Sequence, residues 1–347
     1  MRFARSWSRL ELTSVLRVDA GHEFGMGHLV RMYALSHALG ERGIAAHFLT
    51  ASSAAREWLR VRGLKNELLD VDAGSYRDTA AVLEYADKVK ARWIVTDGCH
   101  LREEYLNSLV GGGVPVISID DMGRIFFPSA LVVNGGVAAG TLQYKVSAGT
   151  TLLLGPEYLI LRPEFRRRRV GGPSEVKRII VCFGGADPED YTGRVLDILT
   201  CWPEFPRDIE VNVVAGSAYG KLGELRQRAE SCGARVLSDI AAAAFSKLML
   251  QSDLAITSAG MVACEIAATG LASILIVISE DQLPNATALA AAGAARVIDP
   301  LSEKHLLTVL EELLSDRGAR QAMAKASRHL VDGLGRERVA DAILSLQ

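Results

Sequence analysis

A glycine-rich turn between an apolar segment and an amphipathic one is the feature that most restricts the fold of this chain. Residues 14–18 (SVLRV) have the pattern of a short buried strand, and residues 29–39 (LVRMYALSHAL) have the spacing of a helix. Between them lies Gly25-Met26-Gly27-His28. This order places the turn at the carboxyl edge of a parallel sheet, where open α/β folds bind ligands. We expect His28 at or near the first helical residue, where free amides favour an anion.

The same alternation of short apolar segments and helical patterns continues along the chain, which predicts βαβ units and mostly parallel sheets. We expect further strands at 46–50, 92–96, 114–119, 130–133, 178–183, 210–214, 254–257 and 273–278. We expect further helices at 54–62, 78–90, 102–110, 220–231 and 261–269, and a helical segment at 302–347 with a break at Asp332-Gly333.

The length of 347 residues favours two domains of about 150 residues each. An arginine-, proline- and glycine-rich stretch near the middle marks the boundary. Its arginine run could bind phosphate or nucleic acid, but in so neutral a chain we interpret it as an exposed linker. We predict an N-terminal Rossmann-like domain at 13–163, a linker at 164–174 and a C-terminal Rossmann-like domain with a helical tail at 175–347. Two such doubly wound domains predict a substrate in an interdomain cleft, and residues 1–12 form a polar lead-in.

Composition narrows the classes of partner. The net charge of −2 and the aromatic content of 6% argue against nucleic acid. The five cysteines are scattered and form no Cys-x-x-Cys pair, which favours reduced thiols in a cytoplasmic protein. No apolar run reaches the ~18 residues of a membrane span, and none follows the N-terminal arginines as a secretory signal would require.

Several common catalytic signatures are missing from the sequence. There is no His-Glu-x-x-His, no Gly-x-Ser-x-Gly and no Walker lysine motif. The glycine turn also lacks the third glycine of the dinucleotide fingerprint. We therefore expect neither a metal ion nor an organic cofactor, and look for chemistry among histidines and carboxylates.

His28 is the histidine best placed for acid–base chemistry. The positive end of a helix dipole disfavours an imidazolium, so we expect a lowered pKa and a neutral ring that accepts a proton. The alternative is that His28 only caps the helix or packs. His22 and His100 also lie in predicted loops and stay open as candidates.

Carboxylates gather at the predicted strand ends of both domains. Asp19, Asp97, Asp120 and Asp121 follow strands of the first domain, so we expect them to line one polar rim. In the second domain, the helix start after Ser258-Ala259-Gly260 suits a diphosphate. Glu265, one turn on, would bridge two ribose hydroxyls. The alternative for Glu265, a solvent-facing side chain, is disfavoured by its apolar neighbours.

The opening motif Asp19…Gly25-x-Gly27-His28-x-x-Arg31 resembles that of the UDP-2,4-diacetamido-2,4,6-trideoxy-β-L-altropyranose hydrolases of pseudaminic acid biosynthesis. More distantly, Glu265-Ile266-Ala267-Ala268-x-Gly270 resembles the nucleotide-binding segment of the glycosyltransferase that adds N-acetylglucosamine in peptidoglycan synthesis. Both groups have the GT-B fold. The hydrolase resemblance covers about residues 13–300 and includes Asp120-Asp121, LGPEYLILRPEF at 154–165, FGGADP at 183–188, Ser258-Ala259-Gly260 with Glu265, and Asp281-Gln282.

This resemblance implies an α/β enzyme of the GT-B type whose C-terminal domain holds UDP. His28 would be the general base for a water that displaces UDP from the anomeric carbon with inversion. Helix starts after Gly185 and Gly260 would stabilise the leaving diphosphate without metal. The partner would be a UDP-sugar, and the protein a monomer or weak homodimer. The residues expected to bind the substrate are Asp19, Gly25, Gly27, Arg31, Asp97, Asp121, Gly184, Gly185, Asp187, Ser258, Ala259, Gly260, Glu265, Gln282 and Asn285.

Two departures from the family pattern concern the sugar. Asp97-Gly98-Cys99-His100 stands where the family commonly has Asp-His-Tyr-Gly, and Cys264 stands where an aromatic residue often precedes the glutamate. We therefore expect the family's altropyranose derivative or a close UDP-linked deoxyamino sugar. Two other functions stay open: a glycosyltransferase in which His28 deprotonates an acceptor hydroxyl, and a nucleotide-sugar-binding protein without activity.

Overall fold

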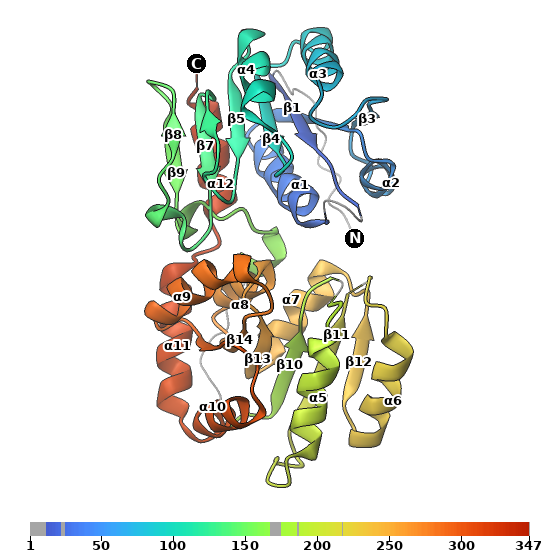
Figure 1. The fold of residues 1–347 in the computed structure, drawn as a ribbon, viewed down its shortest axis with the longest axis vertical. Helices are drawn as coiled ribbons and strands as arrows, with labels where there is room; N and C mark the ends of the chain where they lie inside the picture. The colour runs from blue at the N-terminus through green and yellow to red at the C-terminus, as the bar shows by residue number, and fades with distance from the viewer. Residues whose placement is uncertain (1–11, 22–24, 167–174, 186, 217, 347) are drawn as a thin grey trace. The chain divides into compact units, whose positions relative to one another are not determined.

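The computed structural model describes residues 12–21, 25–166, 175–185, 187–216 and 218–346. The chain divides into two compact units, shown in Figure 1. The first unit combines residues up to Arg162 with residues 334–347, and the second is Pro163–Gly333. Each described unit contains a parallel β-sheet with helices packed on its faces (Figure 1).

The sheet of the first unit runs in the order β3-β2-β1-β4-β5-β7-β9. Every described strand pair in it is parallel. The chain moves outward from β1 in both directions, so the order reverses between β1 and β4. Such a switch point is where open α/β sheets bind ligands. The strands are β1 (Leu12–Val18), β2 (Ile44–Thr50), β3 (Asn66–Leu68), β4 (Trp93–Asp97), β5 (Val116–Ile119), β7 (Leu131–Asn134) and β9 (Thr151–Leu154).

Two helices of the first unit begin at a serine that caps them. The hydroxyl of Ser52 accepts from the amide of Ala55, and that of Ser75 from Asp78, which satisfies amides that the first helical turn leaves unpaired. A small second sheet pairs β6 (Phe126–Phe127) with β8 (Lys145–Val146). The helices are α1 (Gly27–Gly40), α2 (Ser53–Val61), α3 (Tyr76–Lys88), α4 (Glu103–Gly111) and α12 (Gly335–Leu344).

The second unit repeats the design. Its sheet runs in the order β12-β11-β10-β13-β14-β15 and reverses between β10 and β13. The strands are β10 (Arg178–Cys182), β11 (Glu210–Ala215), β12 (Arg235–Ser238), β13 (Leu254–Ser258), β14 (Ala272–Ile276) and β15 (Arg296–Ile298). The helices are α5 (Tyr191–Cys201), α6 (Leu222–Cys232), α7 (Ala242–Gln251), α8 (Met261–Thr269), α9 (Leu283–Ala291), α10 (Glu303–Ser315) and α11 (Arg317–Leu330).

Central strands bury both faces, which explains their continuous apolar sequence. In β1, Leu16 packs into the core on one side of the sheet and Val15 into the core on the other. The second unit has the same arrangement, with Ile179 and Ile180 of β10 in two different apolar clusters. Helices on both faces of a parallel sheet require this pattern.

The last helix, α12, belongs to the first unit rather than to the C-terminal domain that we expected at 175–347. Val339, Ala340 and Ile343 are fully buried in the apolar cluster that also contains Leu35 of α1. A Cβ on Gly335 would lie 2.3 Å from the carbonyl oxygen of Leu159, so α12 starts in close contact with that backbone. An amphipathic pattern alone does not identify which apolar surface it covers.

Two other expected segments fall largely outside the described residues. Of the linker predicted at 164–174, residues 167–174 are not described. Pro163–Arg166 forms a 3₁₀ turn in the second unit, with Phe165 buried. Of the predicted lead-in at 1–12, only Leu12 is described, and it begins β1.

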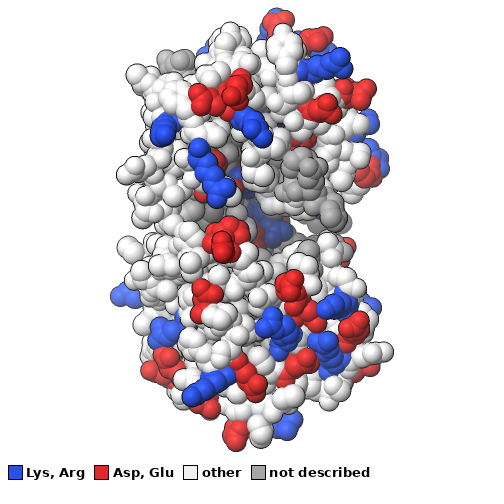
Figure 2. All heavy atoms as spheres, viewed as in Figure 1, with Lys and Arg blue, Asp and Glu red and all other residues white. Residues whose placement is uncertain are grey.

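Charged side chains of both signs are interspersed over each unit on the face shown in Figure 2. This matches the near-zero net charge of −2. Among the described residues, no helix combines the length and the apolar character that crossing a membrane requires.

Candidate active site

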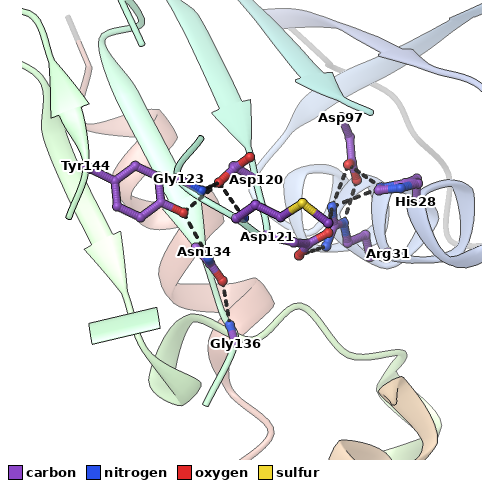
Figure 3. A network of polar contacts seen from close by, with 10 residues as sticks. His28, Arg31, Asp97, Asp120, Asp121, Gly123, Asn134, Gly136 and Tyr144 are labelled. Atoms are coloured by element: carbon purple, nitrogen blue, oxygen red, sulfur yellow. Dashed lines mark hydrogen bonds and ion pairs between the residues drawn. The ribbon is translucent and has the colours of Figure 1, made fainter. Parts of the chain in front are cut away.

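Three neighbouring strands deliver the polar residues of the first unit to one edge of the sheet. The turn after β1 leads to His28, the second residue of α1, as we expected. Asp97 is the last residue of β4, and its backbone lies beside Val18 of β1. Asp121 follows β5. Figure 3 shows their side chains converging on Arg31 from α1.

His28 and Asp97 form a close pair. Nδ1 of His28 lies 2.7 Å from Oδ1 of Asp97, whose side chain is fully buried. Burial opposes ionisation of Asp97, but the charge and hydrogen bonds of Arg31, with those of His28, hold its pKa below the ordinary value. An ionised carboxylate only accepts hydrogen bonds, so Nδ1 of His28 carries the donated proton. Nε2 of the neutral ring is then a proton acceptor.

The expected lowering of the His28 pKa is wrong. Burial does lower the pKa, but the hydrogen bond and charge of Asp97 outweigh it, and the net pKa is raised above 6.5. The partial charge of a helix terminus is smaller than the full charge of a carboxylate in hydrogen-bond contact. His28 is therefore a stronger base than the turn alone predicts, and its side chain keeps 18% of its surface exposed.

Arg31 is a partner of both carboxylates. Nε lies 2.6 Å from Oδ2 of Asp97, and one terminal nitrogen lies 2.6 Å from Oδ1 of the same residue. The other terminal nitrogen lies 2.6 Å from Oδ1 of Asp121. These contacts hold the guanidinium inside the protein and differ from the substrate-binding role that we expected for Arg31.

Asp19 lies in a separate buried cluster. Its carboxylate accepts from the hydroxyl of Thr50 at 2.9 Å and from the amide of Ala51 at 2.7 Å. It also lies 2.7 Å from Arg17 and 3.3 Å from Nε2 of His100. Although burial opposes ionisation, these contacts hold the pKa of Asp19 well below its ordinary value. They favour a structural role for Asp19 rather than the predicted contact with substrate.

Asp120 also points away from His28. One oxygen accepts from the amides of Met122 at 2.8 Å and Gly123 at 2.6 Å, and from the hydroxyl of Tyr144 at 2.7 Å (Figure 3). Asn134 donates to the same hydroxyl at 2.8 Å. Of the four aspartates expected on one rim, only Asp97 and Asp121 lie in the His28 cluster.

His100 explains a departure from the family pattern. A Cβ on Gly98 would lie 2.6 Å from Cε1 of the His100 ring, so this ring position leaves room only for glycine at 98. The two ring nitrogens of His100 are buried, while Cys99 is exposed. His100 therefore contributes packing around Asp19.

The glycines of the turn leave open space. Gly25 has a φ of +69°, which favours glycine, and its backbone pairs with that of Gly21. A Cβ on Gly25 or Gly27 would meet no atom of another described residue within 4 Å. The candidate His22 lies outside the described residues.

In the second unit, the start of α5 is already capped. The carboxylate of Asp187 accepts from the amides of Tyr191 at 2.9 Å and Thr192 at 2.7 Å. Asp190 accepts from the amide of Gly193 at 3.1 Å. These amides are therefore occupied, which makes the helix start after Gly185 less suited to a diphosphate than we expected. It also makes Asp187 a helix cap rather than an evident substrate ligand.

Gly184 and Gly185 pack closely against the neighbouring loop. Gly184 has a φ of +89°. A Cβ on Gly216 would lie 2.3 Å from the carbonyl oxygen of Gly185, and the amide of Ala218 donates to that oxygen at 3.1 Å. The missing side chain of Gly216 thus permits its loop to contact the backbone of Gly184 and Gly185, whereas a Cβ on either of these two would meet no described atom within 4 Å.

The loop before α8 is held by two amide side chains. Gln282 accepts from the amide of Ala259 at 3.1 Å, and Asn285 donates to the carbonyl of Ala259 at 2.7 Å. The N-cap of α8 is Gly260, and the described part of the chain supplies no side-chain cap there. Ser258 is buried next to this loop. Gln282 and Asn285 therefore position the loop whose helix start we expect to face an anion.

Glu265 is buried on α8, with 3% of its surface exposed. The solvent-facing alternative is thus wrong. Burial first, and then the charge of Glu265, raise the pKa of the Cys264 thiol to about 11. Burial is likewise the main cause that raises the pKa of Cys182 to about 12, to which Glu265 also contributes.

Some residues of the first-unit edge carried no signal in the sequence. Arg17 donates to both oxygens of Asp78 at 2.8 and 2.7 Å, and Tyr105 lies 3.3 Å from the same carboxylate. These partners lie in α3 and α4, far from Arg17 in sequence. Among the described residues, no group of three or more His, Cys, Asp or Glu is arranged to hold a metal ion.

Comparison with known proteins places these sites in context. Residues 179–343 match the glycosyltransferase family 28 C-terminal domain. The spore coat polysaccharide biosynthesis protein SpsG of Bacillus subtilis (strain 168) is 26% identical over 346 residues, which covers 92% of this chain and 94% of that protein.

Two further similarities concern the peptidoglycan glycosyltransferase. UDP-N-acetylglucosamine--N-acetylmuramyl-(pentapeptide) pyrophosphoryl-undecaprenol N-acetylglucosamine transferase of Xylella fastidiosa (strain M12) is 30% identical over 186 residues, 51% of this chain and 50% of that protein. The crystal structure of Acinetobacter baumannii MurG has a TM-score of 0.68 at 16% identity and covers 96% of this chain and 100% of that chain. The chain therefore has the GT-B fold, as we expected.

Proposed function

We propose that this protein is a nucleotide-sugar enzyme of the glycosyltransferase type, which moves a sugar from UDP to an oxygen nucleophile in the biosynthesis of a polysaccharide. The observation that carries the proposal is the 2.7 Å contact between His28 and the buried Asp97 at the carboxyl edge of the first sheet. The names of SpsG and of the N-acetylglucosamine transferase, together with the family 28 domain at 179–343, support the class of reaction.

The chemistry needs one base. Nε2 of His28 would accept the proton of a hydroxyl group as its oxygen bonds to the anomeric carbon of the donor sugar. The bond from that carbon to the diphosphate oxygen breaks, and UDP leaves with the electron pair. Asp97 holds the ring by Nδ1 and stabilises the imidazolium that forms, as a carboxylate does in a catalytic triad.

The second unit would bind the nucleotide. The uncapped start of α8 offers amide groups and the positive end of a helix dipole, which suit a diphosphate and the charge that develops on it. Glu265, one turn along the same helix, would accept from the ribose hydroxyls. The start of α5 is a weaker candidate because Asp187 occupies its amides.

A second candidate is hydrolysis, in which water replaces the acceptor hydroxyl. Resemblance to the UDP-altropyranose hydrolases over the motifs at residues 19–31, 154–165 and 183–188 favours it. The base, the bond that breaks and the leaving group are the same in both candidates. Only the nucleophile differs.

One assay separates the two candidates. UDP release is followed for a panel of UDP-sugars, UDP-linked deoxyamino sugars included, with and without hydroxyl acceptors. Acceptor-dependent release supports transfer, and equal release without acceptor supports hydrolysis. UDP binding without turnover of any donor would refute both and leave a binding protein.

A further inference from the structure

Arg31 uses most of its donors inside the protein. A guanidinium has five N–H groups. Two contacts go to Asp97, and two more go to Asp121 at 2.6 and 3.0 Å. The Arg31 side chain is only 10% exposed. Little of this group is left for a ligand in solution.

Arg31 also approaches the base itself. A terminal nitrogen lies 3.0 Å from Nδ1 of His28. Because Nδ1 of His28 donates its proton to Asp97, Nδ1 and the nearby terminal nitrogen of Arg31 are both donors. The positive charge of Arg31 also disfavours a second proton on the His28 ring. An arginine in this position weakens the base unless another charge compensates it.

Asp121 supplies that compensation. It contacts both terminal nitrogens of Arg31, one of which also contacts Asp97, and its own side chain is 49% exposed. With Asp97, Asp121 and Arg31 ionised, the cluster carries one net negative charge when His28 is neutral. Protonation of His28 by a substrate hydroxyl then brings the cluster to neutrality.

The position of Asp121 is fixed by its neighbour in the chain. Asp120 accepts from the amides of Met122 and Gly123 and from Tyr144, which closes the turn after β5 (Figure 3). Gly123 has a φ of +64°, a conformation that favours glycine. The turn therefore presents Asp121 to Arg31 in a defined place.

We propose that Arg31 and Asp121 are positioning residues, which hold Asp97 against His28 and balance the charge around the base, rather than ligands of the substrate. This inference rests on the proposed role of His28 as base. Among the residues that the structure describes, the charged groups that act on His28 are Asp97 from β4, Arg31 from α1 and Asp121 from the turn after β5.

The test measures His28 directly. The Cε1 proton of His28 is followed by NMR through a pH titration of the full chain and assigned from its loss in His28→Asn. In Asp121→Asn we expect the midpoint to move to lower pH than in the wild type, because the positive charge of Arg31 is no longer balanced. Asp121→Glu keeps the charge and is expected to restore the midpoint. Asp70→Asn, which removes an exposed carboxylate of the same unit, is expected to leave it unchanged.

Kinetics give a second readout. In Asp121→Asn the acidic limb of kcat should move to lower pH while KM for the donor stays within about twofold. Arg31→Lys loses the fork geometry and should lose about 10²-fold in kcat, the scale of a misplaced catalytic group. An unmoved titration midpoint in Asp121→Asn, or a raised KM with an unmoved acidic limb, would overturn the inference.

Failure of the proposed function gives a different result. If no donor is turned over, the proposed function fails, yet the NMR midpoints of the wild type and Asp121→Asn still decide whether Asp121 acts on His28. If His28→Asn turns over as fast as the wild type, the base assignment fails and the inference falls with it.

Discussion

The protonation state of His28 depends mainly on one neighbouring residue, Asp97. Asp97 raises the pKa of His28 above 6.5 despite burial, so the neutral ring needed for catalysis is lost as pH falls through a value above 6.5. We therefore expect kcat to fall on the acidic side of that pKa and to level off above it. In Asp97→Asn the limb should move to lower pH, and the plateau should drop because the ring loses its anchor. A limb that stays in place would show that another group titrates.

Removal of the base itself is the simplest residue-scale test. His28→Asn should lose about 10²–10⁴-fold in kcat, the usual contribution of a general base. UDP affinity, measured by calorimetry, should stay unchanged because we place the nucleotide in the second unit. Turnover within a few-fold of the wild type would refute the assignment.

Glu265 gives a prediction for the nucleotide. Glu265→Gln keeps the size of the buried side chain but removes its charge. If Glu265 accepts from the ribose, UDP binding should weaken by about 1.5–3 kcal/mol, the range for hydrogen bonds to a charged group. Calorimetry with UDP measures this, and kcat at saturating donor should change much less. Unchanged UDP affinity would remove Glu265 from the site.

The residue scale also shows where sequence reasoning failed. Four strand-end aspartates were expected on one polar rim, but only Asp97 and Asp121 lie in the His28 cluster, because the role of each depends on its partners. Asp19 contacts Arg17 and His100, whereas Asp97 contacts Arg31 and His28. These pairs join segments far apart in the chain, and no local spacing encodes them.

At the scale of elements, the cap of α5 is testable. Asp187→Ala leaves the amides of Tyr191 and Thr192 without their carboxylate, which should destabilise the protein by about 0.5–2 kcal/mol. Glu189→Ala, an exposed change in the same loop, should cost less than about 0.5 kcal/mol. Urea unfolding measures both. A large loss of UDP affinity in Asp187→Ala with unchanged stability would instead make Asp187 a ligand.

Elements in the middle of each sheet were predictable, and those at the edges were less so. β4 and β13 are buried throughout and have continuous apolar sequences. β3 and β12 lie at the sheet edges, have partly exposed residues and were not predicted. Their short, mixed sequences carry little periodicity, because only part of each strand is buried.

At the scale of the whole molecule, α12 completes the first unit. Ile343 is fully buried against that core. Ile343→Ala should cost about 2–5 kcal/mol. The neighbouring Leu344 is 39% exposed, so Leu344→Ala is a matched control that should change stability little. Thermal unfolding monitored by near-UV circular dichroism compares the two. Equal losses would contradict the packing of α12.

The return of α12 also sets an order of events during protein synthesis. The second unit is one continuous segment, Pro163–Gly333, whereas the first needs residues 334–347 as well. Domains of a nascent chain generally fold as units, the N-terminal one first. Here the unit that carries His28 is translated first, yet it cannot be completed until residues 334–347, which follow the whole second unit, have been made. A premature stop codon after Gly333 would therefore spare the sequence of the second unit and damage the unit made at the beginning.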